Sequence, residues 1–448
     1  MLRAPTLRGH ARVSKTATIS RKITQNVDSS GALRLHSRDR GRSMSVNAIE
    51  HRAARAPIAP VLRRGSLRPW RKSTLPALLD GSERLLTTSG RAALALAFEQ
   101  LAICAGDEVL MPAYHCLAMR APVLALGALP VFYRLGEDLS IDIADISPLV
   151  TARTRCIVAV HFFGFPQPLE ALRELCDRSR TALIEDCAHA FYGPRAAQQI
   201  GRCGDFAVGS LMKFFPVFDG GCLVSFRRPL TRVRLRSRGL LFQLKAALHV
   251  IECAANWSRG GLLGLIAAAS ARAAKFAKRA HPGLTQQLAQ ASPGAALGSL
   301  DFQPEWVHTR ISLASRFILG AADHRHSIAR RRQIFSRLLA GLSALRAGRP
   351  LYSSLPEGVV PYVFPMVLAD PAVSFDALRA AGVPMYRWED VAEETCATAR
   401  FYKARLVQFP CHQSLTDVEV TELIETIARV LNTSALTTNA ASAQDVRP

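Results

Sequence analysis

Residues 204–224, GDFAVGSLMKFFPVFDGGCLV, place one lysine between two apolar runs. The runs at 206–211 and 222–226 are rich in β-branched and aromatic residues and are flanked by glycines, which predicts two strands. Lys213 follows the first strand with apolar residues on both sides. Such surroundings disfavour the charged form of a lysine, so its pKa falls and the free amine can attack a carbonyl. The stretch favours Schiff-base chemistry, although a lysine at a strand end more often only reaches solvent.

Apolar runs alternate with helix-period segments over residues 76–226, which include this lysine. The alternation predicts an α/β fold, with a mostly parallel sheet and helices on both of its faces. In sheets of this kind, ligands bind at the edge where the strands end. The other predicted strands are 108–111, 130–133, 156–162 and 182–185, and the predicted helices are 91–103 and 169–179.

The stretch ALIEDCAHAFYG, residues 182–193, ends a predicted strand in two acidic residues. Asp186 lies at the carboxyl end of that strand, where an isolated charge is costly unless a cation meets it. A protonated pyridine nitrogen is a suitable partner, and His189 can lie beside the same ring. An aspartate after a strand is also a common helix cap, so these residues alone leave both interpretations open.

A helix start is indicated by TTSGRAALALA, residues 87–97. Backbone N–H groups at a helix start form an anion site, and Gly90 lets a phosphate approach the main chain closely. The guanidinium of Arg91 adds a charge-assisted contact, and Ser210, three residues before Lys213, supplies a second donor. Taken alone, a Ser-Gly helix start is more often a cap than a phosphate site.

A phosphate cradle, an acid for a ring nitrogen and a lysine for an aldehyde are together what pyridoxal phosphate requires. At these motifs the sequence resembles the DegT/DnrJ/EryC1/StrS family of sugar aminotransferases, which have fold type I, the fold of aspartate aminotransferase. The resemblance is close over residues 76–226 and looser over 350–432. Further stretches that carry it are GDEVLMPAYHCLA, GALPVFY, VHFFGFP and LVQFPCHQSLTDVEV.

The resemblance implies a site and a reaction. Lys213 matches the lysine that binds the cofactor aldehyde and moves the proton in transamination, and Asp186 matches the partner of the pyridine nitrogen. The other cofactor-binding positions that it implies are Gly90, Arg91, Ala92, His189 and Ser210. The implied reaction moves an amino group, typically from glutamate, to the keto carbon of a nucleotide-linked sugar in polysaccharide or glycoside biosynthesis. Related dehydratases carry histidine in place of the lysine, so Lys213 favours transamination.

The sequence departs from the family pattern at two cofactor positions. Arg91 replaces the usual threonine, and a guanidinium can bind phosphate directly. The aromatic residue expected against the cofactor ring aligns with Cys116, which leaves His115 or Tyr114 for that role.

Two segments also differ from the family in length or content. The connection from Ser210 to Lys213 is two residues shorter than in most members, which predicts a tighter turn. A homodimer is implied because fold-type-I sites usually lie between subunits. The segment that supplies Asn and Arg across that interface is not recognisable in 239–310.

The net charge of +22 is concentrated in two segments of the 448-residue chain. Residues 1–72 carry 17 Lys/Arg against 3 acids and residues 227–281 carry 12 against 1, so the remainder is nearly neutral. No aromatic-rich basic sheet or recognition helix accompanies this charge, so nucleic-acid binding is not expected. The ten cysteines show neither a C-x-x-C pair nor zinc-ligand spacing, which predicts reduced thiols in the cytoplasm and no metal site.

Charge and periodicity divide the chain into five parts. Residues 1–72 are expected to be a disordered basic extension, of which the first 43 resemble a transit segment or precede a second plausible start at Met44. Residues 73–238 are expected to form a large domain that binds pyridoxal phosphate, and 310–432 a small α+β domain with helices around 330–345, 374–381 and 416–431. Between them lies a basic helical insertion, 239–309, and the tail 433–448 is expected to be disordered.

The first part of this insertion, 239–281, has a helical period with one leucine-rich face. It is expected to pack on the body or on a second subunit, and the alternative is peripheral contact with an anionic membrane. The apolar run at 260–271 is shorter than the roughly 20 residues that span a bilayer, so no spanning helix is expected. The residues on the leucine-rich face are Leu240, Leu241, Leu244, Leu248 and Ile251.

Four further side chains are open to more than one interpretation. His161 in VHFFGFP is either an active-site imidazole or a histidine packed beneath the cofactor. Arg387 and Trp388 suit a diphosphate and a base at the substrate mouth, or form a surface pair. The role of His412 is open in the same way.

The sequence leaves two other functions open. One is another fold-type-I reaction, such as condensation or lyase chemistry on amino acids, and the other is that of a catalytically inactive relative that contacts a membrane.

Overall fold

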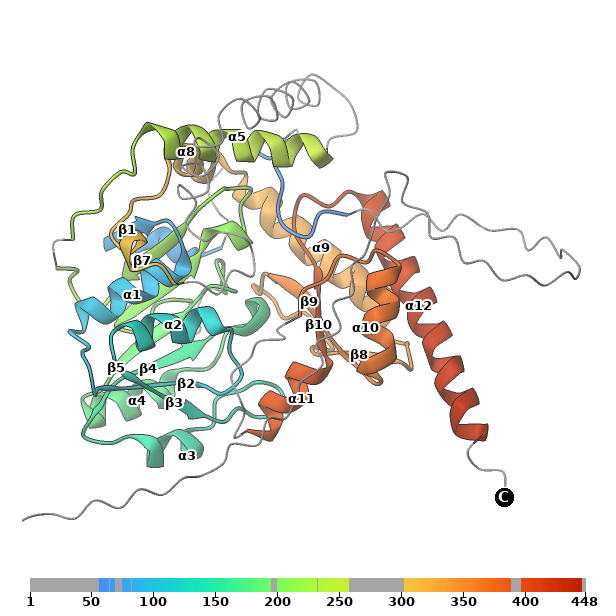
Figure 1. The fold of residues 1–448 in the computed structure, drawn as a ribbon, viewed down its shortest axis with the longest axis horizontal. Coiled ribbons are helices and arrows are strands. Elements are labelled where there is room, and N and C mark those ends of the chain that lie inside the picture. Colours follow the sequence, from blue (N-terminus) through green and yellow to red (C-terminus); the bar gives the residue numbers. More distant parts are fainter. Residues whose placement is uncertain are drawn as a thin grey trace, which may run out of the picture. The chain divides into compact units, whose positions relative to one another are not determined.

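The computed structural model describes residues 56–63, 65–68, 75–81, 83–194, 200–231, 233–257, 302–387 and 396–444, with the backbone alone from 434 onward. Within these ranges a seven-stranded sheet has the order β1-β7-β6-β5-β4-β2-β3. β7 is antiparallel to β1 and to β6, and the other neighbouring strands are parallel (Figure 1). The strands are β1 (Glu83–Thr87), β2 (Glu108–Pro112), β3 (Leu129–Tyr133), β4 (Thr154–Val160), β5 (Ala182–Asp186), β6 (Phe206–Ser210) and β7 (Gly221–Ser225).

Helices lie on both sides of this sheet. α1 (Gly90–Gln100) contacts α2 (Leu117–Ala125), and α3 (Ile143–Ile146) contacts α4 (Glu170–Ser179). In Figure 1 these two pairs lie on opposite sides of the strands. The central strands β2, β5 and β7 are buried along their whole length, as expected for strands covered on both faces. The structure therefore confirms the predicted α/β class.

Two short 3-10 turns follow strands at the edge that was predicted to carry ligands. η3 (Phe162–Gly164) ends β4 two residues earlier than predicted, because Phe163 takes a left-handed backbone conformation with φ 57°. η4 (Leu211–Lys213) follows β6 directly, which agrees with the tight turn expected from the shortened connection. Asp186 at the end of β5 lies opposite Val160 of β4 and Val208 of β6.

A second, antiparallel sheet lies in the C-terminal part, in the order β10-β9-β8. Its strands are β8 (Gly348–Pro350), β9 (Val363–Leu368) and β10 (Leu406–Pro410), and its helices are α9 (His324–Leu342), α10 (Pro371–Ala380), α11 (Ala397–Arg405) and α12 (Asp417–Gln444). The predicted boundary at 432 differs from the structure, because α12 continues to Gln444. Residues 433–444 are rich in alanine, which favours continuation of the helix.

Residues 56–63 correct part of the prediction for the N-terminal extension. Ala56 and Val61 are buried, and the main chain of Val61 both donates to and accepts from the hydroxyl of Ser414. The carbonyl of Ile58 accepts a hydrogen bond from the hydroxyl of Tyr386. This stretch is therefore an ordered strap on the C-terminal part, held by backbone hydrogen bonds that composition does not reveal.

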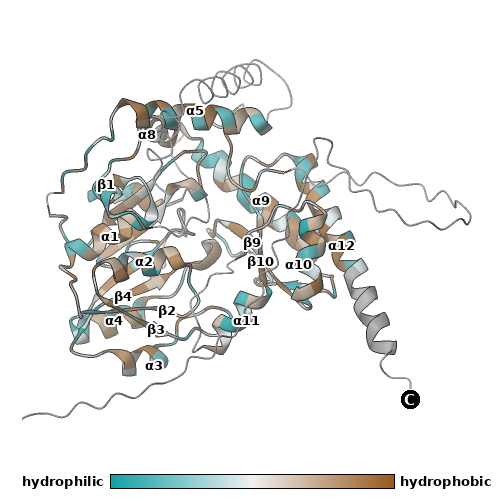
Figure 2. Cartoon of the chain, in the orientation of Figure 1, coloured by the Kyte–Doolittle hydropathy of each residue, from teal (hydrophilic) through white to brown (hydrophobic). Residues whose placement is uncertain are grey.

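The helical insertion begins with α5 (Leu240–Trp257), which packs against α8 (Leu313–Ala321). Its buried side chains are Phe242, Ala246, Val250 and Ala254, spaced four residues apart. The predicted leucine-rich face instead points outward, with Leu240 83%, Leu244 54% and Phe317 of α8 67% exposed. Figure 2 shows apolar residues on both helices. The predicted apolar run 260–271 lies outside the described residues.

In the described part of the chain, no helix is both long enough and apolar enough to cross a membrane. All ten cysteines lie in the described ranges, and none forms a disulfide. Residues 51–448 group as one unit by their contacts, so the division into a large and a small domain remains a proposal, which the two separate sheets support.

Candidate active site

The end of β5, the end of β6 and the first turn of α1 meet at one edge of the large sheet. Asp186 is the last residue of β5, Ser210 the last of β6, and Lys213 closes the turn η4. A Cβ atom on Gly90 would lie 3.5 Å from the Cβ of Ser210, so the start of α1 touches the end of β6. The structure thus brings together the lysine, the acid and the predicted phosphate turn.

Lys213 faces a mixture of apolar and polar groups. Burial lowers its pKa, and the neighbouring Cys116 and Asp186 partly offset this effect. Its Nζ lies 5.4 Å from the centroid of the Tyr362 ring. A larger fraction of this amine is therefore uncharged near neutral pH than for an ordinary lysine.

Asp186 is a buried carboxyl group with 8% of its surface exposed. Its Oδ1 accepts a hydrogen bond from the N–H of Ala188 at 2.8 Å. Burial raises its pKa, and the bond from Ala188 and the charge of Lys213 oppose that rise. A buried carboxyl group in this state gains most from a cationic partner that arrives with a ligand.

His189 is held as a neutral imidazole. Its ring stacks on Tyr362 with centroids 4.7 Å apart and on Phe163 at 5.6 Å. The N–H of Phe163 donates to its Nδ1 at 3.4 Å, and burial keeps its pKa well below the ordinary value. In the neutral ring Nε2 therefore carries the proton, which makes it a donor to an acceptor atom of a ligand.

The phosphate turn rests on very close main-chain packing. The Ser89 side chain caps α1 by accepting from the N–H of Ala92 at 3.2 Å, so this amide serves the cap. A Cβ atom on Gly221, at the start of β7, would lie 2.1 Å from the carbonyl oxygen of Ser89. The hydroxyl of Thr88 is buried and has no partner among the described residues, which leaves a donor beside the turn. Arg91 lies half-buried in the first turn of α1.

We expect Gly221→Ala to displace the start of α1, because the new methyl group would overlap backbone atoms that cannot rotate away. The free energy of unfolding should fall by about 1–3 kcal/mol, as for other overpacked sites. Chemical denaturation measures this. The control is Gly320→Ala in α8, where nothing lies within 4 Å and the helix should gain stability. Equal stability of Gly221→Ala and the parent would contradict the expectation.

His115, which was predicted to lie against the cofactor ring, packs at the end of β2. Its ring stacks on Phe132 of β3 at 4.9 Å, and its Nδ1 lies 2.8 Å from the carbonyl oxygen of Pro112. These contacts fix the ring at the end of β2, and its role at the cofactor stays a prediction. The neighbour that interacts with both Lys213 and Asp186 is Cys116, at the start of α2. Tyr114, the alternative for that role, is buried between Phe162 and Tyr402.

His161 belongs to a network beneath the site. The N–H of Gln167 donates to its Nδ1 at 2.9 Å, so its Nε2 carries the proton and donates to Glu185 at 2.9 Å. Glu185 also accepts from three backbone N–H groups, those of Gly201, Cys203 and Gly204. His161, Glu185 and Cys187 are close enough to hold a metal ion. Both ring nitrogens and both carboxylate oxygens are already used, which favours a structural role for this group.

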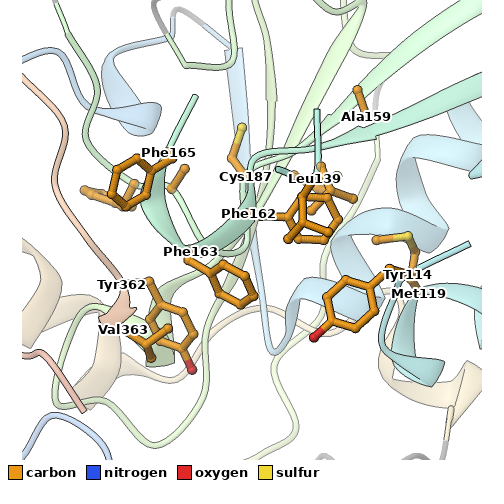
Figure 3. Packing of buried hydrophobic residues seen from close by; sticks show 14 of the residues in the cluster. Tyr114, Met119, Leu139, Ala159, Phe162, Phe163, Phe165, Cys187, Tyr362 and Val363 are labelled. Atoms are coloured by element: carbon orange, nitrogen blue, oxygen red, sulfur yellow. The ribbon is translucent and has the colours of Figure 1, made fainter. Parts of the chain in front are cut away.

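Tyr362 is a site residue that the sequence did not predict. Its N–H donates to the carbonyl of Phe163 at 2.8 Å. Gly164, with φ 101°, allows this approach, because a Cβ atom there would lie 2.4 Å from the carbonyl oxygen of Val360. Figure 3 shows the rings of Phe163 and Tyr362 side by side. The motif VPYVFP carries no signal for this role, since its pattern is that of a buried strand.

A cavity adjoins Lys213 on the side of the C-terminal part. The strap residues 58–60 form one of its walls, so the N-terminal segment borders the reactive amine. His412 also lines it, but its Nε2 lies 2.9 Å from the carbonyl of Pro57 and thus holds the strap. The Arg387 guanidinium stacks on Phe375 at 3.9 Å. Trp388, predicted at the substrate mouth, lies outside the described residues.

Comparison with known proteins shows what the segment that contains this site is similar to. Residues 74–233 match the sequence model of the DegT/DnrJ/EryC1/StrS aminotransferase family. The segment contains every residue that was predicted to bind the cofactor or to react, and the matched family is one of aminotransferases.

Curated relatives match the same part of the chain. A GDP-perosamine synthase from Vibrio cholerae is 35% identical over 141 residues, which is 31% of this chain and 38% of that protein. An L-glutamine:2-deoxy-scyllo-inosose aminotransferase from Streptomyces paromomycinus is 34% identical over 175 residues, 37% of this chain and 41% of that protein. The chain thus spans about two fifths of the length of these relatives.

A solved structure extends the likeness in fold to most of the chain. The aminotransferase TlmJ from Streptoalloteichus hindustanus matches with a TM-score of 0.53 and 22% identity, covering 78% of this chain and 86% of that one. At this identity the match supports the fold.

Proposed function

We propose that this protein is a pyridoxal-phosphate-dependent aminotransferase that transfers an amino group from glutamate to the keto carbon of a nucleotide-linked sugar.

 The observation that carries the proposal is that Lys213 and Asp186 interact electrostatically at the strand ends, where the start of α1 at Gly90 touches Ser210. A GDP-perosamine synthase and an inosose aminotransferase among the relatives support a sugar or sugar-like acceptor. The absence of disulfides among the ten cysteines supports a cytoplasmic enzyme.

The residues present fit pyridoxal phosphate. Lys213 supplies an amine of lowered pKa for its aldehyde, Asp186 a carboxylate for its ring nitrogen, and the Nε2–H of His189 a donor for an oxygen of the ring. The first turn of α1, with Gly90 and Arg91, and the hydroxyl of Ser210 are placed to hold its phosphate. When bound, the cofactor supplies an electron sink for the carbon that loses a proton. Lys213 is the base that takes this proton and returns it.

Borohydride reduction followed by peptide mass spectrometry tests the cofactor assignment. We expect a phosphopyridoxyl group on Lys213 and on no other lysine. Addition of glutamate to the loaded protein should then bleach the absorbance band of the lysine-bound cofactor, and a nucleotide-linked keto sugar should restore it. Glutamine is the matched second donor, because one relative is named for its use of L-glutamine. A colourless protein with unmodified Lys213 would refute the assignment and favour an inactive relative. Cofactor binding without bleaching by any donor would favour another fold-type-I reaction.

We also propose that the enzyme is a homodimer that buries the outward apolar face of α5 and α8. This face consists of Leu240, Leu241, Leu244, Leu248, Leu313 and Phe317, all more than a third exposed in the single chain. Exposed apolar side chains gathered on two packed helices are typical of an interaction site. Its opposite side already packs on the body through Phe242 and Ala246.

The double variant Leu244→Glu, Phe317→Glu is expected to shift the protein from dimer to monomer, because each carboxylate would have to be buried in the interface. Light scattering after size-exclusion chromatography measures the mass. The control, Val373→Glu, changes an exposed apolar residue of α10 and should leave the dimer intact. A monomeric parent protein that sediments with anionic phosphatidylglycerol vesicles would contradict the dimer and support the alternative of membrane contact.

A further inference from the structure

Arg331 of α9 is a fully buried arginine whose hydrogen bonds all go to neutral groups. Its Nε donates to Oε1 of Gln413 at 2.9 Å. Its Nη1 donates to the carbonyls of Pro361 and Tyr362, each at 3.1 Å, and its Nη2 donates to the carbonyl of Lys213 at 2.9 Å. Within the described residues, no carboxylate forms an ion pair with it.

Burial of the Arg331 charge without an ionic partner costs free energy of folding. Burial lowers the pKa of Arg331 to about 10, which reflects the loss of hydration of its charge. An isolated buried charge is costly unless hydrogen bonds compensate for its lost hydration. A role in packing therefore does not account for the guanidinium, and its five donors must serve the groups that they contact.

The groups that Arg331 contacts come from both sides of the site. One is the turn η4, which carries Lys213, and another is the segment before β9, which carries Tyr362. Gln413 reinforces the arrangement, since its Nε2 donates to the carbonyl of Phe214 at 2.7 Å. The guanidinium also stacks on the ring of Phe214 at 4.6 Å. A single side chain thus joins the backbone of the reactive lysine to the backbone of the tyrosine whose ring its amine faces.

We propose that Arg331, with Gln413, is a positioning residue that fixes the Lys213 amine over the Tyr362 ring and toward Asp186. It acts through the carbonyls of Lys213 and Tyr362 and touches neither substrate nor cofactor. The inference rests on the proposed function only in taking Lys213 as the reactive amine. The titratable groups around that amine are Asp186, Cys116, His189 and Tyr362.

Arg331→Met tests this role, with Arg332→Met as the matched control. Arg332 is the next residue of α9 and also donates to backbone carbonyls, those of Pro356 and Val359, but it does not contact the turn of Lys213. The first readout is the pH midpoint for acetylation of Lys213 in cofactor-free protein, followed by peptide mass spectrometry. The pH midpoint reports the surroundings of the amine, whereas the rate of acetylation also depends on how easily the reagent reaches it.

We expect the midpoint of Lys213 to move toward that of an ordinary lysine in Arg331→Met, because the loosened turn lets water reach the amine. Arg332→Met should leave it unchanged. The second readout is affinity for pyridoxal phosphate, which should fall about tenfold or more in Arg331→Met, since small misplacements of reactive groups are expensive. Thermal unfolding confirms that the variants are folded. If Arg331→Met does not fold, Gln413→Leu provides the same test with a smaller expected change.

The outcomes separate this inference from the proposed function. A shifted midpoint in a protein that binds no pyridoxal phosphate would support the positioning role and refute the cofactor. Normal attachment of the cofactor to Lys213 in the parent, with unchanged midpoint and affinity in folded Arg331→Met and Gln413→Leu, would overturn the positioning role alone. Equal changes in the Arg331 and Arg332 variants would overturn it as well, because they would indicate general loosening of α9.

Discussion

Lys213→Ala is expected to abolish covalent capture of pyridoxal phosphate and to lower amino transfer by about 10³-fold or more, as for loss of a group that moves a proton. The side chain is the only lysine among the described residues that the structure places beside Asp186 and Tyr362. Borohydride trapping should give no phosphopyridoxyl peptide, and rapid-mixing absorbance with glutamate should show little conversion. The variant should remain folded, because burial penalises the charged amine that it removes.

A half-buried lysine in another element provides the control for this experiment. Lys403 lies in α11, in the C-terminal part, and Lys403→Ala should trap the cofactor on Lys213 as the parent does. Added methylamine is a second check, since a small amine can replace the missing proton carrier without restoring the covalent bond to the protein. Full activity of Lys213→Ala would assign the chemistry to another group and would leave the resemblance to the family as a likeness of fold.

The sequence predicted the positions of site residues at strand ends better than those of site residues that distant helices and loops contribute. Asp186 and Ser210 end the parallel strands β5 and β6, and Lys213 lies in the turn after β6. Parallel strands bring their carboxyl ends to one edge of a sheet, so these positions follow from the strand pattern. Gly90 was predicted for a similar reason, because a Ser-Gly pair before an apolar periodic segment marks a helix start. The predicted α/β class follows from the same alternation of strands and helices.

The remaining site residues depend on side-chain directions and on distant contacts. His115 and Cys116 are neighbours in sequence, and only the backbone path from β2 into α2 decides which of them faces Lys213. Arg331 lies in the run ARRRQ, which resembles a solvated helix face, yet its guanidinium is fully buried. The strap at 56–63 is held by groups more than 300 residues away in the chain, including Ser414 and Tyr386. Local patterns carry no information on such contacts.

Asp186→Asn is expected to lower amino transfer by at least about 100-fold, because the amide cannot provide the negative charge that stabilises a protonated ring nitrogen. The same change should leave the cofactor-free protein as stable as the parent or make it more stable. Burial raises the pKa of Asp186 in the folded state. A carboxyl group of this kind favours folding while it is protonated, and this contribution is lost as the pH rises through the raised pKa. At neutral pH its ionised form is therefore a cost that the amide removes.

Asp205 provides the matched comparison, because its pKa is lowered in the folded state whereas that of Asp186 is raised. It is also a buried aspartate beside the large sheet, but it accepts from Arg173 at 3.0 Å and Arg228 at 2.8 Å. Burial alone would raise its pKa, yet the N–H of Leu183 and the Arg173 guanidinium lower it overall. Its ionised form therefore stabilises the fold above the ordinary pKa, and this contribution is lost as the pH falls through the lowered pKa. Asp205→Asn should unfold at a lower temperature and still bind the cofactor.

Cofactor affinity measured against pH distinguishes the two aspartates further. In the parent, affinity should fall as acidification protonates Asp186, because a neutral carboxyl group no longer attracts a cationic ring. This dependence should disappear in Asp186→Asn and persist in Asp205→Asn. If Asp186→Asn destabilised the cofactor-free protein as Asp205→Asn does, and kept the pH dependence of the parent, Asp186 would be a structural acid. The ring nitrogen would then need another partner at the end of β5.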